Sequence, residues 1–454
     1  MQLLLIECRF LWVYLQIEII WYTCATEQDI RVALSTLPKG LEETYQRCVK
    51  RINCHDPRAI RTLVWVRFSA RPLHCEELKE AVALDLNDKC WDPEKVPRCD
   101  FILGWCANLV VLDPVDNCAR FAHPSICQYL DSSFDAYLLQ FPESVRSGNQ
   151  ICGRLCITYL SFSDFHLHLS KTRKEIMEWD LRSKDFIPKN VPGFRLIKRF
   201  LPSRLKRKLP VSLPSPPLRT VPSPSLARYR FLSYARNHWT THTKYFSEQD
   251  PLWDMFKLLA LTSNESWGLH PWKADGRSQF SHLQAMFGWA VRERHLPLFE
   301  LAMQFPNHIR RICDLPLSGE LLPALHYACK QGYFDMVSRL LPFCDINTLD
   351  LQDFTPLHYA VERGHASTVN ILLRQKGLKA KREIHVKGEL LLLASSKGHT
   401  ETVKTLIKEG ADLEARNSKS QTSLIVAAAS GNTSMVKFLV EEGADMEAVE
   451  QEGD

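Results

Sequence analysis

The sequence predicts a mainly α-helical protein whose C-terminal third is a solenoid of helical repeats. Two observations carry this prediction. A short motif centred on an alanine recurs every 32 to 34 residues, at Ala328, Ala360, Ala394 and Ala427, and that period is typical of stacked helix pairs. The N-terminal third contains several helical patterns and only one hairpin pattern, and a proline-rich segment separates the two parts.

Length and composition indicate how many domains to expect. The chain has 454 residues, of which 45% are hydrophobic and 24% charged, so we expect two or three ordinary globular domains. The net charge of +5 is too small to indicate by itself a nucleic acid or a membrane. Fifteen cysteines without a CxxC pair or a regular spacing indicate free thiols in a reducing compartment. We therefore expect a cytoplasmic protein, with the nucleus as the alternative.

Residues 1–52 are predicted to be helical. The apolar stretch from Met1 to Tyr22 contains charged residues such as Glu18, and a membrane span would bury each of them at a cost of about 3 kcal/mol. We predict instead a buried amphipathic helix, with Val13 and Ile17 on its inner face, and no membrane segment. Two further helices are predicted at residues 26–35 and 41–52.

Residues 53–165 contain the ingredients of a winged helix. Asp113 to Asn117 has turn chemistry and separates two strand-like segments, Leu109–Leu112 and Ala119–Ala122. A winged helix either binds DNA or serves as a packing unit, and no dense basic recognition helix is present, so we favour the packing role. The helices of this segment are predicted at residues 58–69, 74–84, 98–107, 124–130 and 149–162.

Motifs of these first two segments resemble a family of nucleotide switches. The segments Ile30-Arg-Val-Ala-Leu34, Leu37-Pro38-Lys39 and Leu41-Glu-Glu-Thr-Tyr45-Gln-Arg47 are similar to the end of a NACHT domain. The segments Arg71-Pro72-Leu73 and Phe121-Ala-His123-Pro-Ser125 are similar to the winged-helix region behind it. The resemblance implies a signalling protein, often an immune-type receptor, in which a histidine in the place of His123 approaches the phosphates of a nucleotide.

The chain departs from that family at the nucleotide site. It contains no G-x-x-x-x-G-K-[S/T] loop, whose backbone amides and lysine would hold the phosphates. We therefore expect no cofactor and no enzyme activity, and we expect His123 to bond the local backbone. Two alternatives stay open: a nucleotide-dependent switch ATPase or GTPase, if a NACHT core precedes this chain, and a nuclear DNA-associated factor. Since that core is missing and Met435, Phe438 and Leu439 are expected to lie open at the end of the repeats, we expect a fragment of a longer protein.

Residues 166–224 are predicted to form a linker. Arg195 to Lys208 contains seven basic residues and no acidic one, and a solvated linker is favoured over a nuclear-import or anion-binding segment. The dense prolines between Pro210 and Pro224 cannot continue a helix or donate to a sheet, so an extended spacer follows.

Residues 225–279 are predicted to form a helical connector. Its helices are expected at residues 225–246 and 253–261. His238 and His242 are spaced to lie on one helical face, but a metal would need a third ligand that the sequence does not place. We therefore predict no metal site there.

The periodic motifs resemble ankyrin repeats. The best-formed motif runs from Thr355 to Ala360 and is followed by Gly364. Thr355 and Thr422 are suited to cap the first helices of their repeats and Pro356 to occupy a first turn, while the leucine and alanine of the motif face the core. We predict a degenerate repeat at 280–320, with Arg294 in the place of the glycine, and repeats at 321–353, 354–387, 388–420 and 421–454.

Each repeat is predicted to use the same few structural residues. The glycines end the first helix at positive φ, and His326 and His358 bond the backbone of a neighbouring loop, a bond that Leu392 and Ile425 cannot make. The concave face of the array is expected to bind a protein, and we expect neither a metal, a membrane nor a nucleic acid as partner. The structural residues are Thr355, Pro356, Leu357, His358, Ala360, Gly364, His326, Ala328, Gly332, Ala394, Gly398, Ala427 and Gly431.

Overall fold

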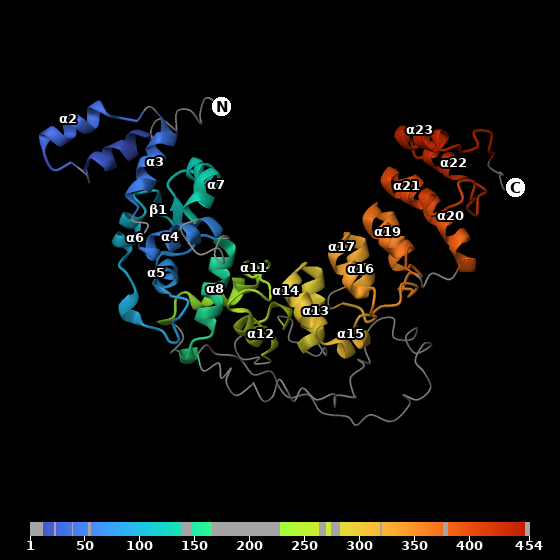
Figure 1. Ribbon diagram of the computed structural model, residues 1–454, viewed down its shortest axis with the longest axis horizontal. Coiled ribbons are helices and arrows are strands. Elements are labelled where there is room, and N and C mark those ends of the chain that lie inside the picture. Colours follow the sequence, from blue (N-terminus) through green and yellow to red (C-terminus); the bar gives the residue numbers. More distant parts are fainter. Residues whose placement is uncertain are drawn as a thin grey trace, which may run out of the picture. The chain divides into compact units, whose positions relative to one another are not determined.

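Figure 1 shows the computed structural model of the chain, which is mainly helical as predicted. It describes residues 12–21, 24–38, 40–52, 56–138, 148–165, 228–262, 269–273, 282–317, 320–375 and 380–449. The described residues form two compact units. The first joins the N-terminal helices to residues 228–262 and Leu269, and the second begins at His270. The basic run Arg195–Lys208 and the proline-rich spacer lie outside the described residues.

Most helices of the first unit begin and end close to the predicted positions, but the helix that begins at Pro124 runs to Leu138, beyond its predicted end at Leu130. Thr26 caps α2, since its hydroxyl accepts a bond from Asp29 N (3.2 Å) and the Asp29 carboxylate accepts one from Thr26 N (2.9 Å). Asp56 caps α4 in the same manner, through Arg58 N. The bounds are α2 Glu27–Ser35, α3 Leu41–Arg51, α4 Pro57–Phe68, α5 Cys75–Ala83, α6 Cys99–Trp105, α7 Pro124–Leu138 and α8 Gly148–Leu160, with short 3-10 turns η1 Pro93–Lys95 and η3 Ser163–Phe165.

The predicted wing is present. Strands β1 Val110–Leu112 and β2 Ala119–Phe121 pair antiparallel, with Val110 opposite Phe121. The turn between them uses the side chains of Asp113 and Asp116 as acceptors for backbone amides. The helices and this hairpin together form the winged-helix region that the sequence predicts.

The N-terminal helix buries a different face from the one we predicted. Residues 12–21 are helical, but Val13 and Ile17 are exposed, whereas Leu15 and Gln16 are buried. Gln16 Nε2 donates to Thr44 Oγ1 of α3 (2.9 Å), so a polar contact fixes the rotation of this helix. No helix among the described residues combines the length and apolar character needed to cross a membrane.

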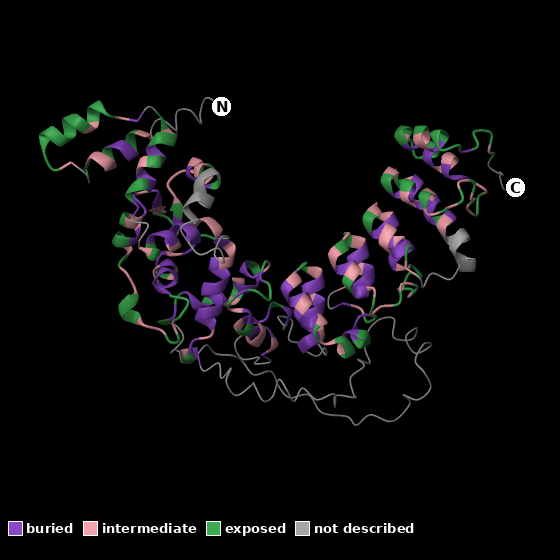
Figure 2. Ribbon diagram, in the orientation of Figure 1, coloured by how far each residue is buried: buried purple, intermediate pink, exposed green. Residues whose placement is uncertain are grey.

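An aromatic core joins the winged-helix region to the connector. The connector helices are α11 Leu232–His242 and α12 Trp253–Leu261, and α11 packs along α8. The Trp65 ring of α4 lies edge-on to Phe231 and Tyr234, with centroids 5.2 and 5.7 Å apart. Helix α11 begins at Leu232, later than the start near residue 225 that we predicted, because a bend at residues 228–231 precedes it. Figure 2 shows the buried residues concentrated along α8 and α4.

A buried carboxylate and a buried ion pair tie the connector to this core. The Glu80 carboxylate accepts bonds from Tyr159 Oη and from the amides of Arg230 and Phe231, each 2.9 Å long. Burial raises the pKa of Glu80 in spite of these donors. Arg154 of α8 pairs with Asp250 (3.0 Å), and both side chains are at most 5% exposed.

One cysteine pair contradicts the expectation of free thiols. Cys75 and Cys99, 24 residues apart at the starts of α5 and α6, form a disulfide. Cys spacing alone could not indicate this pair, because only the packing of α5 against α6 brings the two sulfur atoms together. Cys152 and Cys156 stay unpaired and buried on one face of α8, and burial raises the pKa of each thiol.

The second unit is a two-layer stack of helix pairs. First helices α13, α16, α18, α20 and α22 pack on one another in sequence, and second helices α17, α19, α21 and α23 form the other layer. Its bounds are η7 Pro271–Lys273, α13 His282–Arg292, α14 Leu296–Met303, α15 Pro306–Ile312, α16 Ala324–Gln331, α17 Phe334–Leu340, α18 Pro356–Glu362, α19 Ala366–Leu373, α20 Ala380–Lys397, α21 Thr400–Lys408, α22 Ser423–Ala429 and α23 Thr433–Glu441.

The last helix pair is less open than we predicted. Met435 and Leu439 are fully buried and Phe438 is half-buried. They pack inward because the side of α23 that carries them faces α21 and α22. The exposed apolar side chains at this end are instead Val440 and Met446, followed by Val449.

Candidate interaction surface of the ankyrin repeats

The motif at residues 355–360 builds its helix as expected. Thr355 is the N-cap of α18 and Pro356 occupies the first turn, while Leu357 and Ala360 are buried. His358 differs from the prediction. Its Nδ1 accepts a bond from Thr355 N (3.2 Å), so this histidine caps its own helix and its recorded bonds do not reach a neighbouring loop.

His326 does make the predicted bond across repeats. Its Nε2 lies 3.0 Å from Thr348 O and 3.1 Å from Phe354 O, two carbonyls of the following hairpin. Since both partners are acceptors, Nε2 carries the proton, and burial lowers the pKa of this imidazole. Leu392 replaces this histidine with a buried side chain, whereas Ile425 is only half-buried.

Thr422 takes the position of Thr355 without its bonds. It is the N-cap residue of α22, but its hydroxyl makes no capping bond and is buried without a partner. The prediction of a capping side chain is therefore wrong at Thr422, because the following helix offers no histidine in the place of His358 to complete the box.

The periodic glycines have the backbone conformation that the repeats require. Gly332, Gly364, Gly398 and Gly431 have φ values of +70°, +75°, +75° and +68°. Arg294, in the same place of the degenerate repeat, keeps a φ of +50°. The alanines Ala328, Ala394 and Ala427 are fully buried where neighbouring helices meet.

Three of these glycines, Gly332, Gly364 and Gly398, have a second role that the sequence analysis missed. A Cβ at Gly364 would lie 2.6 Å from Nδ1 of His399, the residue that precedes the second helix of the next repeat. The ring of His399 occupies that space and its Nε2 donates to Glu362 O (2.9 Å). His365 bonds Lys330 O (3.1 Å) in the same way one repeat earlier. In the sequence, His365 and His399 directly follow the periodic glycines Gly364 and Gly398. This position could have indicated the contact with the preceding repeat.

Two hairpins of the stack share an unusual composition. They are residues 313–323, between α15 and α16, and residues 341–355, between α17 and α18; we call them the acidic hairpins. Together they contain five acidic residues and no lysine or arginine. Their exposed large hydrophobic side chains are Leu315, Leu321, Leu349, Leu351 and Phe354, which are 40% to 62% exposed.

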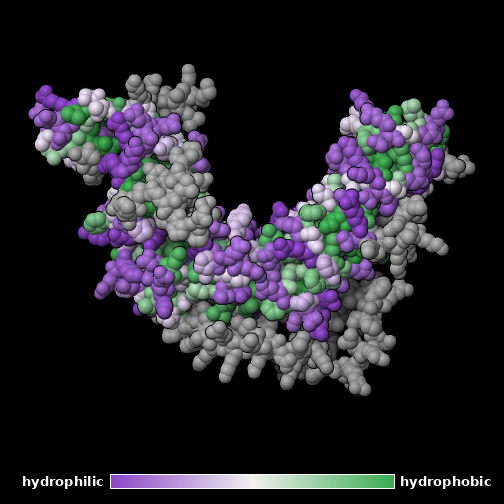
Figure 3. Space-filling model, viewed as in Figure 1, coloured by the Kyte–Doolittle hydropathy of each residue, from purple (hydrophilic) through white to green (hydrophobic). Residues whose placement is uncertain are grey.

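Hydrogen bonds hold the second acidic hairpin in place. Besides the bonds that His326 Nε2 makes to this hairpin, Asp350 N donates to Phe354 O (3.0 Å). Asp350 Oδ1 accepts bonds from the amides of Gln352 and Phe354. Burial would raise the pKa of Asp350, but the bond from Tyr359 Oη (2.7 Å) and the two amides hold it below its usual value. The later hairpin at residues 409–422 exposes no large hydrophobic side chain among its described residues. Figure 3 shows hydrophobic residues lying between hydrophilic ones along the stacked helices.

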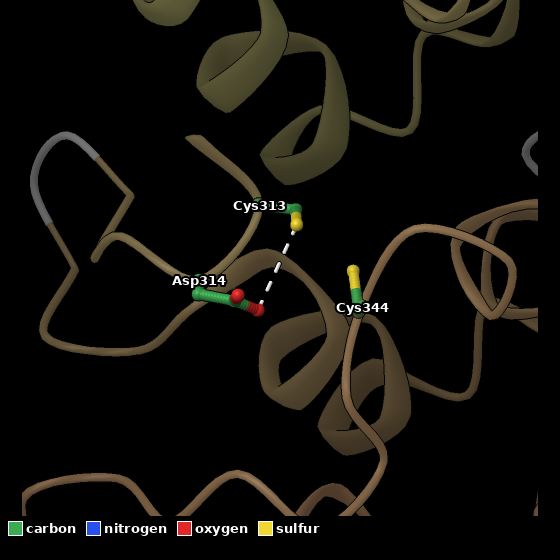
Figure 4. A group of neighbouring side chains, drawn as sticks. All are labelled: Cys313, Asp314 and Cys344. Atoms are coloured by element: carbon green, nitrogen blue, oxygen red, sulfur yellow. Dashed lines mark hydrogen bonds between the residues drawn. The ribbon is translucent and has the colours of Figure 1, made fainter. Parts of the chain in front are cut away.

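The acidic hairpins also contain the one group of described residues that could hold a metal ion. The ligand atoms of Cys313, Asp314 and Cys344 all lie within 4.8 Å of one another. Figure 4 shows how the three side chains lie. His238 and His242 are not part of this group. His242 is instead buried, where its ring bonds Tyr234 Oη (2.8 Å) and Asn149 Oδ1 (3.0 Å).

His123 makes local contacts, as we expected. Its Nδ1 accepts a bond from Ser125 N (3.2 Å) at the start of α7 and lies 2.7 Å from Ser125 Oγ. The same hydroxyl lies 2.6 Å from Tyr45 Oη of α3. The ring therefore helps to join α3 and α7.

Comparison with known proteins matches both parts of the chain. The model of ankyrin repeats matches residues 287–384 and 376–450. The model of the winged-helix domain of GPI inositol-deacylase matches residues 48–137. The azaphilone pigments biosynthesis cluster protein L of Monascus ruber is 29% identical over 149 residues, which cover 30% of this chain and 32% of that protein. The chain thus spans about a third of this relative, and it contains a winged-helix domain followed by ankyrin repeats.

Proposed function

We propose that this chain is an interaction scaffold that binds a protein partner through its ankyrin repeats, with the acidic hairpins as the contact surface. One observation carries the proposal: five large hydrophobic side chains are exposed on two successive hairpins that carry only negative charge. Exposed apolar side chains gathered on one surface and rimmed by charge are typical of protein interfaces.

The chemistry of the surface defines the partner. A segment with apolar side chains would dock on Leu349, Leu351 and Phe354, and lysines or arginines beside them would face the carboxylates. Because His326 and Asp350 already hold the second hairpin in place, little ordering entropy is lost on binding. A nucleic acid would be repelled by the same carboxylates.

The test begins with a displayed peptide library selected on the full chain. We expect selected peptides to combine apolar residues with lysine or arginine. Their affinity is then measured by calorimetry for the natural chain and two variants. Phe354→Ser removes a hairpin side chain that is 40% exposed, and Phe334→Ser removes one that is 46% exposed on α17, outside the hairpins.

Phe354→Ser is expected to weaken binding by more than about tenfold, the usual effect of removing an interface anchor, and Phe334→Ser by less than about twofold. Raising the salt concentration should weaken binding further, because the charges of the partner are screened. Equal effects of the two variants, or selected peptides without basic residues, would overturn the assignment of the surface.

We further propose that the first unit is a packing module of a NACHT-type signalling or immune-type receptor, and that this chain is not an enzyme. The resemblance of the N-terminal motifs and the winged-helix match support this, as do the local bonds of His123. Titration of the chain with ATP and GTP in a calorimeter should give no heat of binding. Micromolar binding would favour the nucleotide-switch alternative. The described residues contain eleven free cysteines and one disulfide, and this excess of free thiols supports a reducing compartment, the cytoplasm or the nucleus.

A further inference from the structure

The turns after α15 and α17 bring two thiols and a carboxylate together. Cys313 directly follows α15 and Asp314 comes next, while Cys344 lies in the turn after α17. Cys313 Sγ is 3.6 Å from Asp314 Oδ1, and every pair of ligand atoms in the group lies within 4.8 Å. Figure 4 shows the two sulfur atoms and the carboxylate on facing turns.

The spacing fits a tetrahedral ion. Zinc binds thiolate sulfur at about 2.3 Å and carboxylate oxygen at about 2.0 Å, so a tetrahedral angle places these two atoms about 3.5 Å apart. The observed separation of Cys313 Sγ and Asp314 Oδ1 is 3.6 Å. The sulfur of Cys344 lies within 4.8 Å of both atoms and supplies the third donor.

The backbone holds both turns in place. Cys313 N donates to Ile309 O (2.8 Å) at the end of α15, and Ala324 N donates to Cys313 O (3.3 Å) at the start of α16. Cys344 N donates to Leu340 O (3.1 Å) at the end of α17. Backbone hydrogen bonds to the ends of α15 and α17 therefore hold the turns that carry the two cysteines, as a preformed metal site requires.

We propose that Cys313, Asp314 and Cys344 bind one Zn²⁺ ion, with a water molecule as the fourth ligand. Two thiolates select zinc over magnesium or calcium, and the carboxylate supplies the third donor. Cys313 is buried, Cys344 half-buried and Asp314 exposed, so the ion and the water enter from solvent. As the two Zn–S bonds form, the two thiol protons pass to solvent, and binding strengthens as the pH rises.

The experiment uses the full chain, reduced and stripped of metal with a chelator, and Co²⁺ as a coloured probe for the zinc site. We expect one equivalent of Co²⁺ to give thiolate-to-metal absorption that added Zn²⁺ removes. Cys344→Ser should lose this absorption, and Asp314→Asn should weaken binding at least about tenfold, the lower end of what even outer-shell changes cost. Cys90→Ser, an exposed cysteine outside the group, is the matched control and should bind as the natural chain does.

The outcomes separate a metal site from a simple thiol pair. Asp314→Asn changes an exposed side chain and leaves both thiols, so it tests the site even if Cys344→Ser fails to fold. If Co²⁺ binds equally to the natural chain and to Asp314→Asn, the carboxylate is not a ligand and the proposed set is wrong. If the stripped chain binds no Co²⁺ and mass spectrometry of the air-exposed chain finds Cys313 joined to Cys344, the group forms a disulfide and the zinc proposal is overturned.

Discussion

Replacing His326 by leucine should loosen the second acidic hairpin without unfolding the repeats. Leucine is tolerated in this register, since Leu392 occupies it two repeats later and is buried. The substitution removes the Nε2–H that bonds Thr348 O and Phe354 O. Phe354 O keeps a second donor, the amide of Asp350 at 3.0 Å.

The magnitude follows from these partners. Loss of one shared hydrogen bond costs about 1 kcal/mol, and an unpaired Thr348 carbonyl adds up to about 1 kcal/mol because the residue is only half-buried. We therefore expect local opening of residues 345–354 to become easier by about 1–2 kcal/mol, which corresponds to about 5- to 30-fold faster amide exchange.

Hydrogen exchange of the full chain, followed by mass spectrometry of peptides, measures this effect. The amides of Asp350 and Phe354 report on the hairpin, and α22 and α23 should exchange at unchanged rates. His308→Leu is the matched control, because His308 is a half-buried histidine of α15 that lies outside both acidic hairpins. Unchanged exchange at residues 345–354, or acceleration spread equally over all repeats, would refute the view that His326 clamps this hairpin.

Three further predictions concern stability. Gly364→Ala should destabilise the repeats by about 2–3 kcal/mol, because its φ is +75° and the new Cβ would lie 2.6 Å from the His399 ring. Gly431→Ala has open space around its Cβ and should cost only about 1 kcal/mol. Thermal or urea unfolding measures both. Arg154→Met should cost the first unit about 3–5 kcal/mol by leaving Asp250 buried and unpaired, and Asp250→Asn in addition should restore part of it; tryptophan fluorescence in urea measures both. Burial, and secondarily the charge of His238, lowers the pKa of His242 to about 4. The first unit should therefore keep its stability above pH 6.5 and lose up to about 3 kcal/mol as the pH falls to 4. His242→Gln should remove this loss. If the urea midpoint changes with pH as much in His242→Gln as in the natural chain, this last prediction is contradicted.

Much of the fold could be predicted because its signals are local. The caps Thr26 and Asp56 lie at most three residues from the amides that they bind, and the turn at Asp113 stands between its own two strands. The repeat register was fixed strongly enough that even Arg294 keeps the positive φ of a glycine position. The errors arose where rotation or pairing depends on a distant partner, as for Gln16 and Thr44 or for Cys75 and Cys99.

The candidate surface was only partly predictable. The sequence placed His326 in the right register, but the same reasoning applied to His358 was wrong, because the acceptor that a histidine meets depends on the shape of the hairpin that follows it. Which hydrophobic side chains stay exposed also needs the packed structure, because Leu321 is exposed while the adjacent Leu322 of the same hairpin is buried.

The sequence by itself determined the helices and their caps, because these depend on residues within one or two turns of one another. It also determined the 32- to 34-residue register of the repeats, because the same local motif recurs at that interval. Only the tertiary structure decided which groups meet over long separations. Glu80 accepts a bond from an amide 151 residues away, and Cys313 faces Cys344 across two hairpins. Such contacts require the backbone of both partners to be in place first, and no local pattern encodes that arrangement.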